Sequence, residues 1–409
     1  MSSHDEIPEE QLWENSRSED EEERADSLLE LGHRARVRQD WTAAKNLYGS
    51  ALDLYEKLEK ESEIGRTIYS LGYCLYRLGE HGDAITTLQR SLAKGRELND
   101  SNMIAYSAGP LGDCLAAVGQ TDEAIEAYDL AVDAFVEIED EASAGFNALS
   151  LGDLHGLSGR QTRALECFIR AFNIFQTGGE AFGSARAKDR MASALIELGD
   201  NEQAIMHLKD ALDIFTFLEA EERIAYTNYR VGWTLNIAGK YIQSESYLRK
   251  ASQSFRAAEE WSRAAMADYH LAMSLIYRDH EQPQPEAEAL IDRIATYFDA
   301  VGEQTNVLMV ESLSADRLMI AGLWDDAAAL WEDILSRAIV YNDQSSIMTA
   351  RVNLAECLFM CGRHLEGQKV FEEVDASFWG ENKPELENIE RVKELMLATM
   401  PSTLPIDVL

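Results

Sequence analysis

A pattern of about 40 residues recurs nine times along this chain, and it constrains the fold more than any other feature. The stretch from Leu111 to Phe135 shows it clearly. A Leu-Gly pair is followed seven residues later by a second Gly, Gly119, and five residues beyond that by Ala124. Self-similarity at a fixed period is the sequence signature of a repeat protein.

Four columns define the repeat. The first is mostly apolar: Leu31, Leu71, Leu111, Leu151, Met191, Val231, Leu271, Ser314 and Leu354. The second is never larger than Ala: Gly32, Gly72, Gly112, Gly152, Ala192, Gly232, Ala272, Ala315 and Ala355. The third is Gly79, Gly119, Gly159, Gly199, Gly239, Gly322 and Gly362, and it is missing in repeats one and seven. The fourth is Ala44, Ala84, Ala124, Ala164, Ala204, Ser244, Ala287, Ala327 and Gly367.

These columns predict a helical hairpin in each repeat. A small residue marks the point where two helices cross closely, and we expect the Ala of the second helix to meet it there. The Gly between them ends the first helix, because it tolerates the left-handed backbone at a helix C-terminus. Such a hairpin cannot bury its apolar face alone, so it must stack on its neighbours.

The columns resemble the tetratricopeptide repeat in a long form of about 40 rather than about 34 residues. They are similar to the repeats of kinesin light chains, LGN/Pins-type scaffolds and bacterial Rap-type peptide receptors. The resemblance covers about residues 24–380. It implies an all-α, right-handed α-α superhelix of nine helical hairpins, whose concave face is lined by each first helix and binds peptides or protein segments.

The rest of the chain suggests four regions. Residues 1–18 are acidic and predicted to be disordered, apart from a Leu12-Trp13 pair that docks on the first repeat or is incidental. The nine-repeat solenoid spans 19–380, and a capping box of Ser18 with Glu21 starts its first helix near Glu19. A capping helix follows at 384–400, then a tail at 401–409. The segment His280 to Pro285 lengthens repeat seven, either as a plain loop or as a contact point.

The formal net charge of −36 disfavours nucleic acid and membrane surfaces as partners. It favours basic or amphipathic protein partners, or serves solubility alone. No run of 18 apolar residues is present.

Cys74, Cys114 and Cys357 share one repeat column, so we expect reduced core cysteines in a cytoplasmic protein. No catalytic motif occurs, and Cys357, Cys361 and His364 make a poor metal set, so we expect no enzyme and no cofactor.

The resemblance places the concave residues five and two before, and two and five after, the first column. On this chain the candidates are Arg66, Tyr69, Tyr73, Tyr76, Tyr106, Tyr226, Tyr229, Trp233, Asn236, Tyr269 and Met273. An aromatic stripe at helical spacing is often core. Here the core columns already hold Ile68, Leu71 and Leu75, so the register favours a groove.

A basic ladder is the second candidate feature: Arg186, Arg190, Arg230 and His270. These cations would anchor a carboxylate or phosphate, or else pair structurally with Asp189, Glu222 and Asp268, which is the preferred interpretation. Family members clamp a C-terminal carboxylate with Lys and Asn. This chain has Asp113 and Asp153 where that Asn would be, which argues against such a clamp.

We therefore expect a non-enzymatic scaffold or adaptor that holds a peptide or protein segment in its groove. The alternative is a receptor for a short signalling peptide, similar to the Rap-type regulators, whose superhelix tightens on binding. Those regulators carry an additional N-terminal helical domain, whereas about 18 residues precede the first repeat here. The sequence identifies neither the partner nor an oligomeric state.

Overall fold

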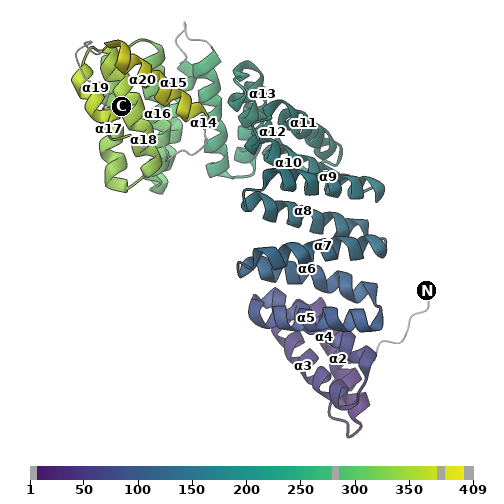
Figure 1. The fold of residues 1–409 in the computed structure, drawn as a ribbon. Coiled ribbons are helices and arrows are strands. Elements are labelled where there is room, and N and C mark those ends of the chain that lie inside the picture. The colour runs from purple at the N-terminus through teal and green to yellow at the C-terminus, as the bar shows by residue number, and fades with distance from the viewer. Residues whose placement is uncertain (1–6, 279–284, 375–382, 400–409) are drawn as a thin grey trace. The chain divides into compact units, whose positions relative to one another are not determined.

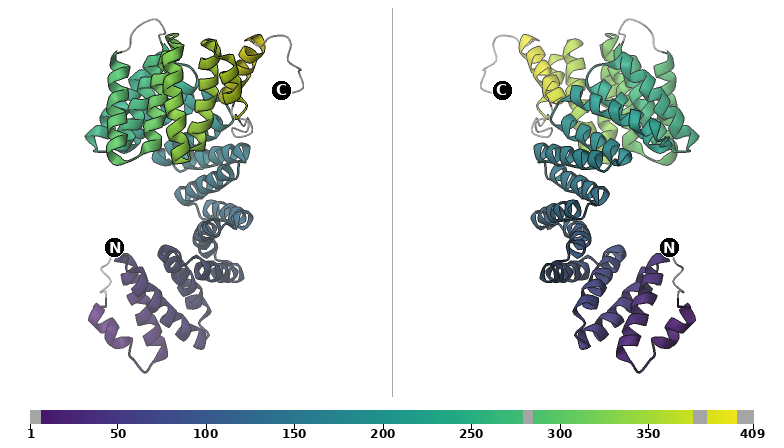
Figure 2. Two further views of the ribbon diagram at one scale, coloured as in Figure 1. Left: turned by 90° about the vertical axis from the view of Figure 1, so that its left-hand side faces the viewer. Right: turned by 90° about the vertical axis from the view of Figure 1, so that its right-hand side faces the viewer.

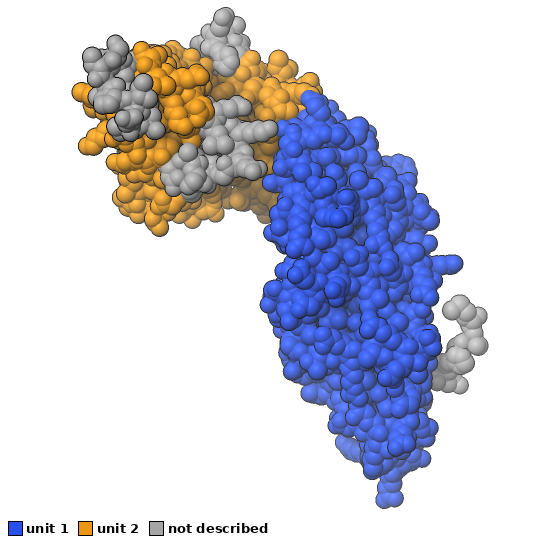
Figure 3. Space-filling model, viewed as in Figure 1, with its two compact units in different colours: residues 1–220 blue, residues 221–409 orange. Residues whose placement is uncertain are grey.

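The helices follow the repeat of the sequence. A computed structural model describes residues 7–278, 285–374 and 383–399, and these residues form helices α1 to α20 with no strand among them (Figure 1). The chain divides into two compact units, residues 1–220 and 221–409 (Figure 3). We call them unit 1 and unit 2. The predicted all-α repeat fold is confirmed.

Each repeat is one hairpin of a first and a second helix, and the hairpins follow one another within each unit (Figure 2). The first helices are α2 (Glu21–Val37), α4 (Glu61–Leu78), α6 (Ser101–Ala117), α8 (Glu141–Leu157), α10 (Ala181–Glu197), α12 (Glu221–Ile237), α14 (Trp261–Arg278), α16 (Gln304–Ile320) and α18 (Gln344–Met360). The second helices are α3 (Trp41–Lys57), α5 (His81–Leu98), α7 (Thr121–Glu137), α9 (Gln161–Thr177), α11 (Asn201–Phe217), α13 (Tyr241–Ala257), α15 (Pro285–Val301), α17 (Trp324–Tyr341) and α19 (His364–Phe371).

Acidic residues and glycines set the helix boundaries. The Asp100 side chain accepts a hydrogen bond from the backbone N–H of Met103, and Asp140 accepts one from Ser143, each at 3.0 Å. Such N-caps satisfy backbone donors that have no partner within the helix. At the other end, every glycine of the third column has a positive φ, as predicted. Four second helices instead end at a left-handed glutamate: Glu59, Glu139, Glu219 and Glu259.

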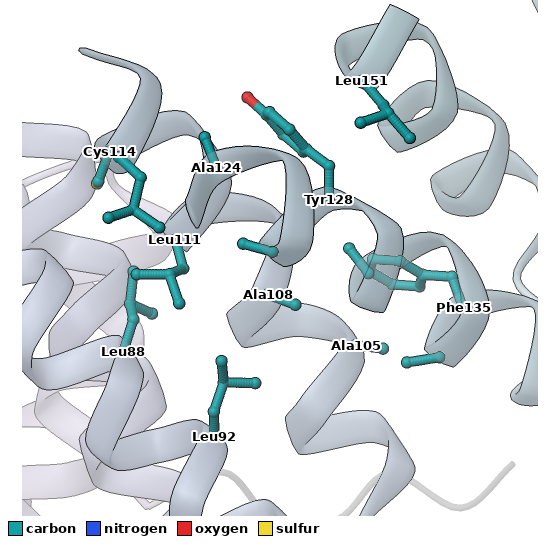
Figure 4. Packing of buried hydrophobic residues seen from close by; sticks show 14 of the residues in the cluster. Leu88, Leu92, Ala105, Ala108, Leu111, Cys114, Ala124, Tyr128, Phe135 and Leu151 are labelled. Atoms are coloured by element: carbon teal, nitrogen blue, oxygen red, sulfur yellow. The ribbon is translucent and has the colours of Figure 1, made fainter. Parts of the chain in front are cut away.

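The second column marks the helix crossings, as predicted, but the side chain nearest to each of its glycines lies one helical turn beyond the predicted fourth-column residue. A Cβ built on Gly152 would lie 2.4 Å from Cε1 of Phe168. Phe168 follows the fourth-column Ala164 by one helical turn, so a larger side chain on the second helix fills the crossing. Tyr128 occupies the same place beside Gly112, within a core that Leu111 and Ala124 share (Figure 4). The whole fourth column is buried, as its small side chains require.

The prediction of a disordered N-terminal tail is wrong for part of residues 1–18. Helix α1 (Glu9–Asn15) forms there, and its Leu12 is buried. Two arginines at the C-terminal end of α2 hold this helix: Arg34 donates to the carbonyl of Ile7 at 2.8 Å, and the C-cap residue Arg38 pairs with Glu9. The first repeat helix starts at Glu21 with Asp20 as its N-cap, rather than near Glu19 with Ser18.

At the C-terminal end of unit 2, helix α20 (Lys383–Thr399) lies close to the position predicted for a capping helix. Its Ile389, Val392 and Met396 are buried against α18. The predicted insertion at residues 280–284 and the tail at 401–409 lie outside the described residues. No helix of the described chain combines the length and apolarity that crossing a bilayer demands.

One core column changes character along the chain. The position three residues before the first column holds Leu28, Ile68, Ala108 and Ala148, and then Lys188, Asn228, Asp268, Glu311 and Arg351. The charged members pair with residues of the second helix of their own hairpin or of the turn that follows it. Lys188 lies 2.6 Å from Asp210, and Arg351 lies 2.6 Å from Glu373. Sequence reasoning missed this column, although its change from apolar to charged was visible.

Candidate ligand-binding surface

Four predicted tyrosines lie together in unit 1. Tyr69, Tyr73 and Tyr76 lie along one face of α4, and all three are partly buried. The ring of Tyr73 is 6.3 Å from Tyr69 and 5.9 Å from Tyr76, while Tyr106 of α6 is 6.3 Å from Tyr69 and 41% exposed. We call these four residues the tyrosine surface. Arg66, which was predicted to share the groove, lies exposed one turn before Tyr69 on α4.

Neighbouring side chains fix the rings of this surface. Arg77 donates to the Tyr73 hydroxyl at 3.2 Å, and its guanidinium lies 4.4 Å from the centre of the Trp41 ring. Tyr106 donates to Asp140 at 3.2 Å. Sequence reasoning did not include Trp41 or Arg77, because Trp41 belongs to a second helix and the family pattern concerns first helices. The surface is thus aromatic, and it is bordered by the positive charge of Arg77 and the negative charge of Asp140.

Burial favours the protonated form of two hydroxyls of this surface, Tyr69 and Tyr76. It raises the pKa of Tyr69 to about 12. The pKa of Tyr76 is also raised, first by burial and then by its hydrogen bond to Asp113. Asp113 accepts a second hydrogen bond from Tyr128 at 2.5 Å. These phenols therefore act as hydrogen-bond donors at neutral pH, and Asp113 is engaged in holding the hairpins together.

The two arginines predicted in unit 1 contact first-helix residues of the preceding repeat. Arg190 Nε lies 3.2 Å from Asp153 Oδ1, and the Arg186 guanidinium lies 5.3 Å from the Phe146 ring centre. Burial raises the pKa of Asp153, and the charges of Arg190 and Arg186 oppose that rise. Arg190 therefore pairs with Asp153, which is not among the partners expected for the ladder, Asp189, Glu222 and Asp268.

In unit 2 the predicted Tyr226 and Tyr229 border a hollow of about 140 Å³ between α12, α13 and α14. Met266 and Phe255 complete its apolar wall. Tyr226 is 39% exposed, and its ring centre is 6.4 Å from that of Tyr229. Trp233 and Met273, on α12 and α14, are partly buried.

Four predicted groove residues of unit 2 are buried instead: Arg230, Asn236, Tyr269 and His270. The Asn236 amide donates to the backbone carbonyl of His270 at 2.8 Å, and Ser274 donates to the Asn236 side-chain oxygen at 2.8 Å. Burial lowers the pKa of His270 to about 4, so the imidazole is neutral near pH 7. His270 cannot serve as a cation of a basic ladder. These positions are covered because α12 and α14 approach closely at Asn236.

Within the described residues, no three His, Cys, Asp or Glu side chains gather where they could hold a metal ion. Cys74, Cys114 and Cys357 are free and buried, as their shared column predicted. Burial raises the pKa of the Cys74 and Cys114 thiols to about 11, which leaves both thiols unreactive at neutral pH.

Two segments of the chain, residues 29–99 and 185–215, match family models described as the tetratricopeptide repeat. A comparison with curated protein sequences gives no match. Among solved structures, the apo quorum sensor NprR from B. thuringiensis is 16% identical, with a TM-score of 0.52 over 93% of this chain and 100% of that one.

Aspartyl phosphate phosphatase F from Bacillus subtilis is 12% identical, with a TM-score of 0.52 over 94% of this chain and 97% of that one. A signal transduction ATPase with numerous domains from Pyrococcus horikoshii carries a tetratricopeptide repeat sensor. It is 12% identical, with a TM-score of 0.54 over 86% of this chain and 55% of that one. At these identities the likeness concerns the fold alone.

Proposed function

Starting from a chain that contains tetratricopeptide repeats, we propose that this protein is a non-enzymatic scaffold or adaptor that holds a peptide or protein segment against the tyrosine surface of unit 1. The observation that carries the proposal is the clustering of Tyr69, Tyr73, Tyr76 and Tyr106 in a partly exposed position. Tyrosines of this kind are over-represented among residues that dominate binding energy.

The neighbours of the surface support the same proposal. Because Arg77 and Asp140 already hold the Tyr73 and Tyr106 hydroxyls, those rings lose little rotational freedom when a partner binds. The chain carries a net charge of −36, so a partner segment with basic or amphipathic character would be attracted over a distance. That the five cysteines form no disulfide supports a proposed location in a reducing compartment such as the cytoplasm.

The test separates affinity from stability. Peptides selected from a displayed library on the purified chain provide the probes, and titration calorimetry gives their affinities. Tyr73→Ala should weaken binding by about 2 kcal/mol or more. The same change should lower the free energy of unfolding by only about 1 kcal/mol or less, since Tyr73 is partly exposed.

Two control variants bracket this result. Phe217→Ala removes an aromatic side chain that is 84% exposed on α11, and it should change neither quantity. Leu111→Ala empties a core site and should cost about 2–5 kcal/mol of stability. If Tyr73→Ala unfolds the chain as readily as Leu111→Ala, Tyr73 belongs to the core and the proposal fails. Unchanged peptide affinity in Tyr73→Ala also rejects it.

A second candidate function is the sensing of a short signalling peptide. The likeness to the quorum sensor NprR, which covers 93% of this chain and 100% of that one, supports this candidate. Small-angle scattering distinguishes the two. A sensor that tightens on its ligand should show a smaller radius of gyration with a selected peptide bound. An unchanged radius at saturating peptide favours the scaffold.

A further inference from the structure

A charged hollow of about 260 Å³ lies between α13, α14 and α15 of unit 2. Its walls include Arg249, Ser252, Gln253, Arg256 and Arg293, together with the carboxylates of Asp268 and Glu286. We call these residues the arginine pocket. We propose that the arginine pocket binds a small oxyanion of the phosphate class, and this proposal does not depend on the tyrosine surface.

Asp268 organises the arginines. Its side chain is almost fully buried, and its Oδ1 accepts a hydrogen bond from Ser252 at 2.6 Å. Arg293 donates to the other oxygen, Oδ2, at 2.8 Å, and Arg256 donates to the same atom. A guanidinium carries five N–H donors, which is more than a shared carboxylate oxygen can accept. Asp268 therefore holds two arginines side by side without exhausting their donors.

Within the same repeat column this arrangement is unusual. Lys188 pairs with Asp210 and Arg351 pairs with Glu373, one cation to one anion, within a hairpin. At Asp268, Arg293 from the same hairpin fills that role, and Arg256 comes in addition from the preceding hairpin. Asp268 carries one negative charge and pairs with two arginines, so this group of three side chains has one positive charge in excess.

The surrounding charges leave a positive excess. Arg249 pairs with Glu286 through both of its terminal nitrogens. Glu245 lies 3.8 Å from Arg249 and 2.6 Å from Arg278. The set then holds four guanidinium groups and three carboxylates, in a chain whose net charge is −36. An anion bound beside Arg256 and Arg293 would balance the excess.

A phosphate group fits both the size and the chemistry of the arginine pocket. A water molecule takes up about 30 Å³ in the liquid, so the hollow has room for a tetrahedral oxyanion and several waters. The planar guanidinium matches phosphate oxygens in pairs, and charge-assisted hydrogen bonds of this kind are strong. Gln253 adds a neutral donor at the wall, whereas the Ser252 hydroxyl is engaged with Asp268.

Titration calorimetry with inorganic phosphate, at constant ionic strength set with sodium chloride, tests the proposal. The unchanged chain should show saturable binding. Arg293→Gln should weaken it at least tenfold, because one of the two guanidinium groups beside Asp268 is lost. Arg263→Gln is the matched control. Arg263 lies on α14, the helix that carries Asp268, but it borders the other hollow, so the phosphate affinity should not change.

A second variant guards against misfolding of the first. Gln253→Glu places a negative charge at an exposed wall position, leaves the bonds of Asp268 intact, and should also weaken phosphate binding at least tenfold. Far-UV circular dichroism confirms that both variants are folded. Absence of saturable binding to the unchanged chain overturns the proposal. Equal affinity in Arg293→Gln, Gln253→Glu and the unchanged chain does so as well.

The source of the phosphate group is distinguished by a second probe. A phosphoserine peptide that binds at least tenfold more tightly than inorganic phosphate, and competes with it, identifies a phosphorylated protein segment as the ligand. Similar affinities for the two probes identify a free phosphate or a small phosphate ester. Both outcomes support the arginine pocket, provided that Arg293→Gln weakens the binding of inorganic phosphate and of the peptide.

Discussion

Gly152 and Gly119 occupy two columns of the same repeat pattern, yet each is needed for a different physical reason. Gly152 lies within α8, and a Cβ there would lie 2.4 Å from the Phe168 ring. Gly119 has a φ of +80°, and a Cβ there would meet nothing within 4 Å. The first site excludes side chains for lack of space, and the second favours glycine through its backbone conformation.

Two pairs of variants should separate these reasons in urea denaturation. Gly152→Ala should cost about 1–3 kcal/mol through overpacking, and Phe168→Leu in the same chain should recover part of that loss. Gly119→Ala should cost about 1 kcal/mol through left-handed strain. Gly119→Asn should cost less, since Asn99 and Asn342 adopt this conformation elsewhere in the chain. Equal costs for Ala and Asn at residue 119 would contradict the backbone explanation.

His270 should make stability depend on pH. Its pKa is lowered by burial to about 4, from an ordinary value of 6.5. Its contribution is therefore complete above pH 6.5 and is lost as the pH falls towards 4, because the unfolded state binds a proton that the folded state rejects. The full loss is roughly 3 kcal/mol. His270→Phe keeps a ring against Tyr229 and Tyr269, so its melting temperature should fall less between pH 7 and pH 4.5.

The titration of Asp316 should change stability with pH in the opposite direction to that of His270. Burial raises the pKa of Asp316 to about 6, so its contribution is complete below pH 3.8 and is lost as the pH rises through 6. Asp316→Asn should therefore gain relative stability as the pH rises, whereas His270→Phe should gain it as the pH falls. Parallel pH profiles for the two variants would show that neither group titrates as described.

Residue-scale prediction from the sequence succeeded where the backbone itself sets the requirement. The glycine columns were predictable because close helix crossings and left-handed turns leave few alternatives. The burial of Asn236 and His270 was not predictable, because it depends on how closely α12 approaches α14 at Ser274. The repeat position of a residue predicts that its side chain faces the concave side, but it does not predict which neighbouring side chains cover it.

At the scale of helices, the pair of Lys188 with Asp210 links α10 to α11 in a position where earlier hairpins use apolar contacts. The Lys188 side chain is 16% exposed, so solvent screens the pair only partly. A double-mutant cycle with Lys188→Met and Asp210→Asn should give a coupling energy of about 1 kcal/mol, at the upper end for ion pairs. A coupling near zero would show that the pair contributes nothing to hairpin packing.

Helix α1 shows why short elements escape sequence analysis. Its stretch from Glu9 to Asn15 covers about two turns, too few to establish an apolar period. The contacts that stabilise it come from Arg34 and Arg38, more than 20 residues along the chain. The capping helix α20 was predictable because its apolar residues recur over several turns.

At the scale of the whole molecule, the repeat architecture should confine damage to its neighbourhood, since each hairpin contacts mainly the next. Removing residues 383–409 uncovers Val352, Ala355 and Phe359 of α18. The loss of Ile389, Val392 and Met396 should cost several kcal/mol, at about 1.5–3 kcal/mol for each buried apolar side chain.

Hydrogen exchange measures where that cost falls. Amide protection should decrease in α18 and its neighbours within unit 2, while α2 to α9 of unit 1 keep their rates. Leu397→Ala is the matched control, because Leu397 lies on α20 but is 57% exposed. A uniform loss of protection along the chain would contradict the local character of the repeats.

The left-handed glutamates at the ends of second helices are sites where protein engineering could increase the stability of the chain. Glu59, Glu139, Glu219 and Glu259 adopt a conformation that costs an L-residue about 1–2 kcal/mol and costs glycine little. Exchanging each for glycine, which has a larger unfolded-state entropy, still leaves a net gain of up to about 1 kcal/mol per site. The four turns are far apart in the sequence, so the gains should add. Glu139 directly precedes Asp140, which binds the Tyr106 hydroxyl of the tyrosine surface. A designer who wants to raise thermal tolerance and leave recognition unchanged would therefore start with Glu59, Glu219 and Glu259.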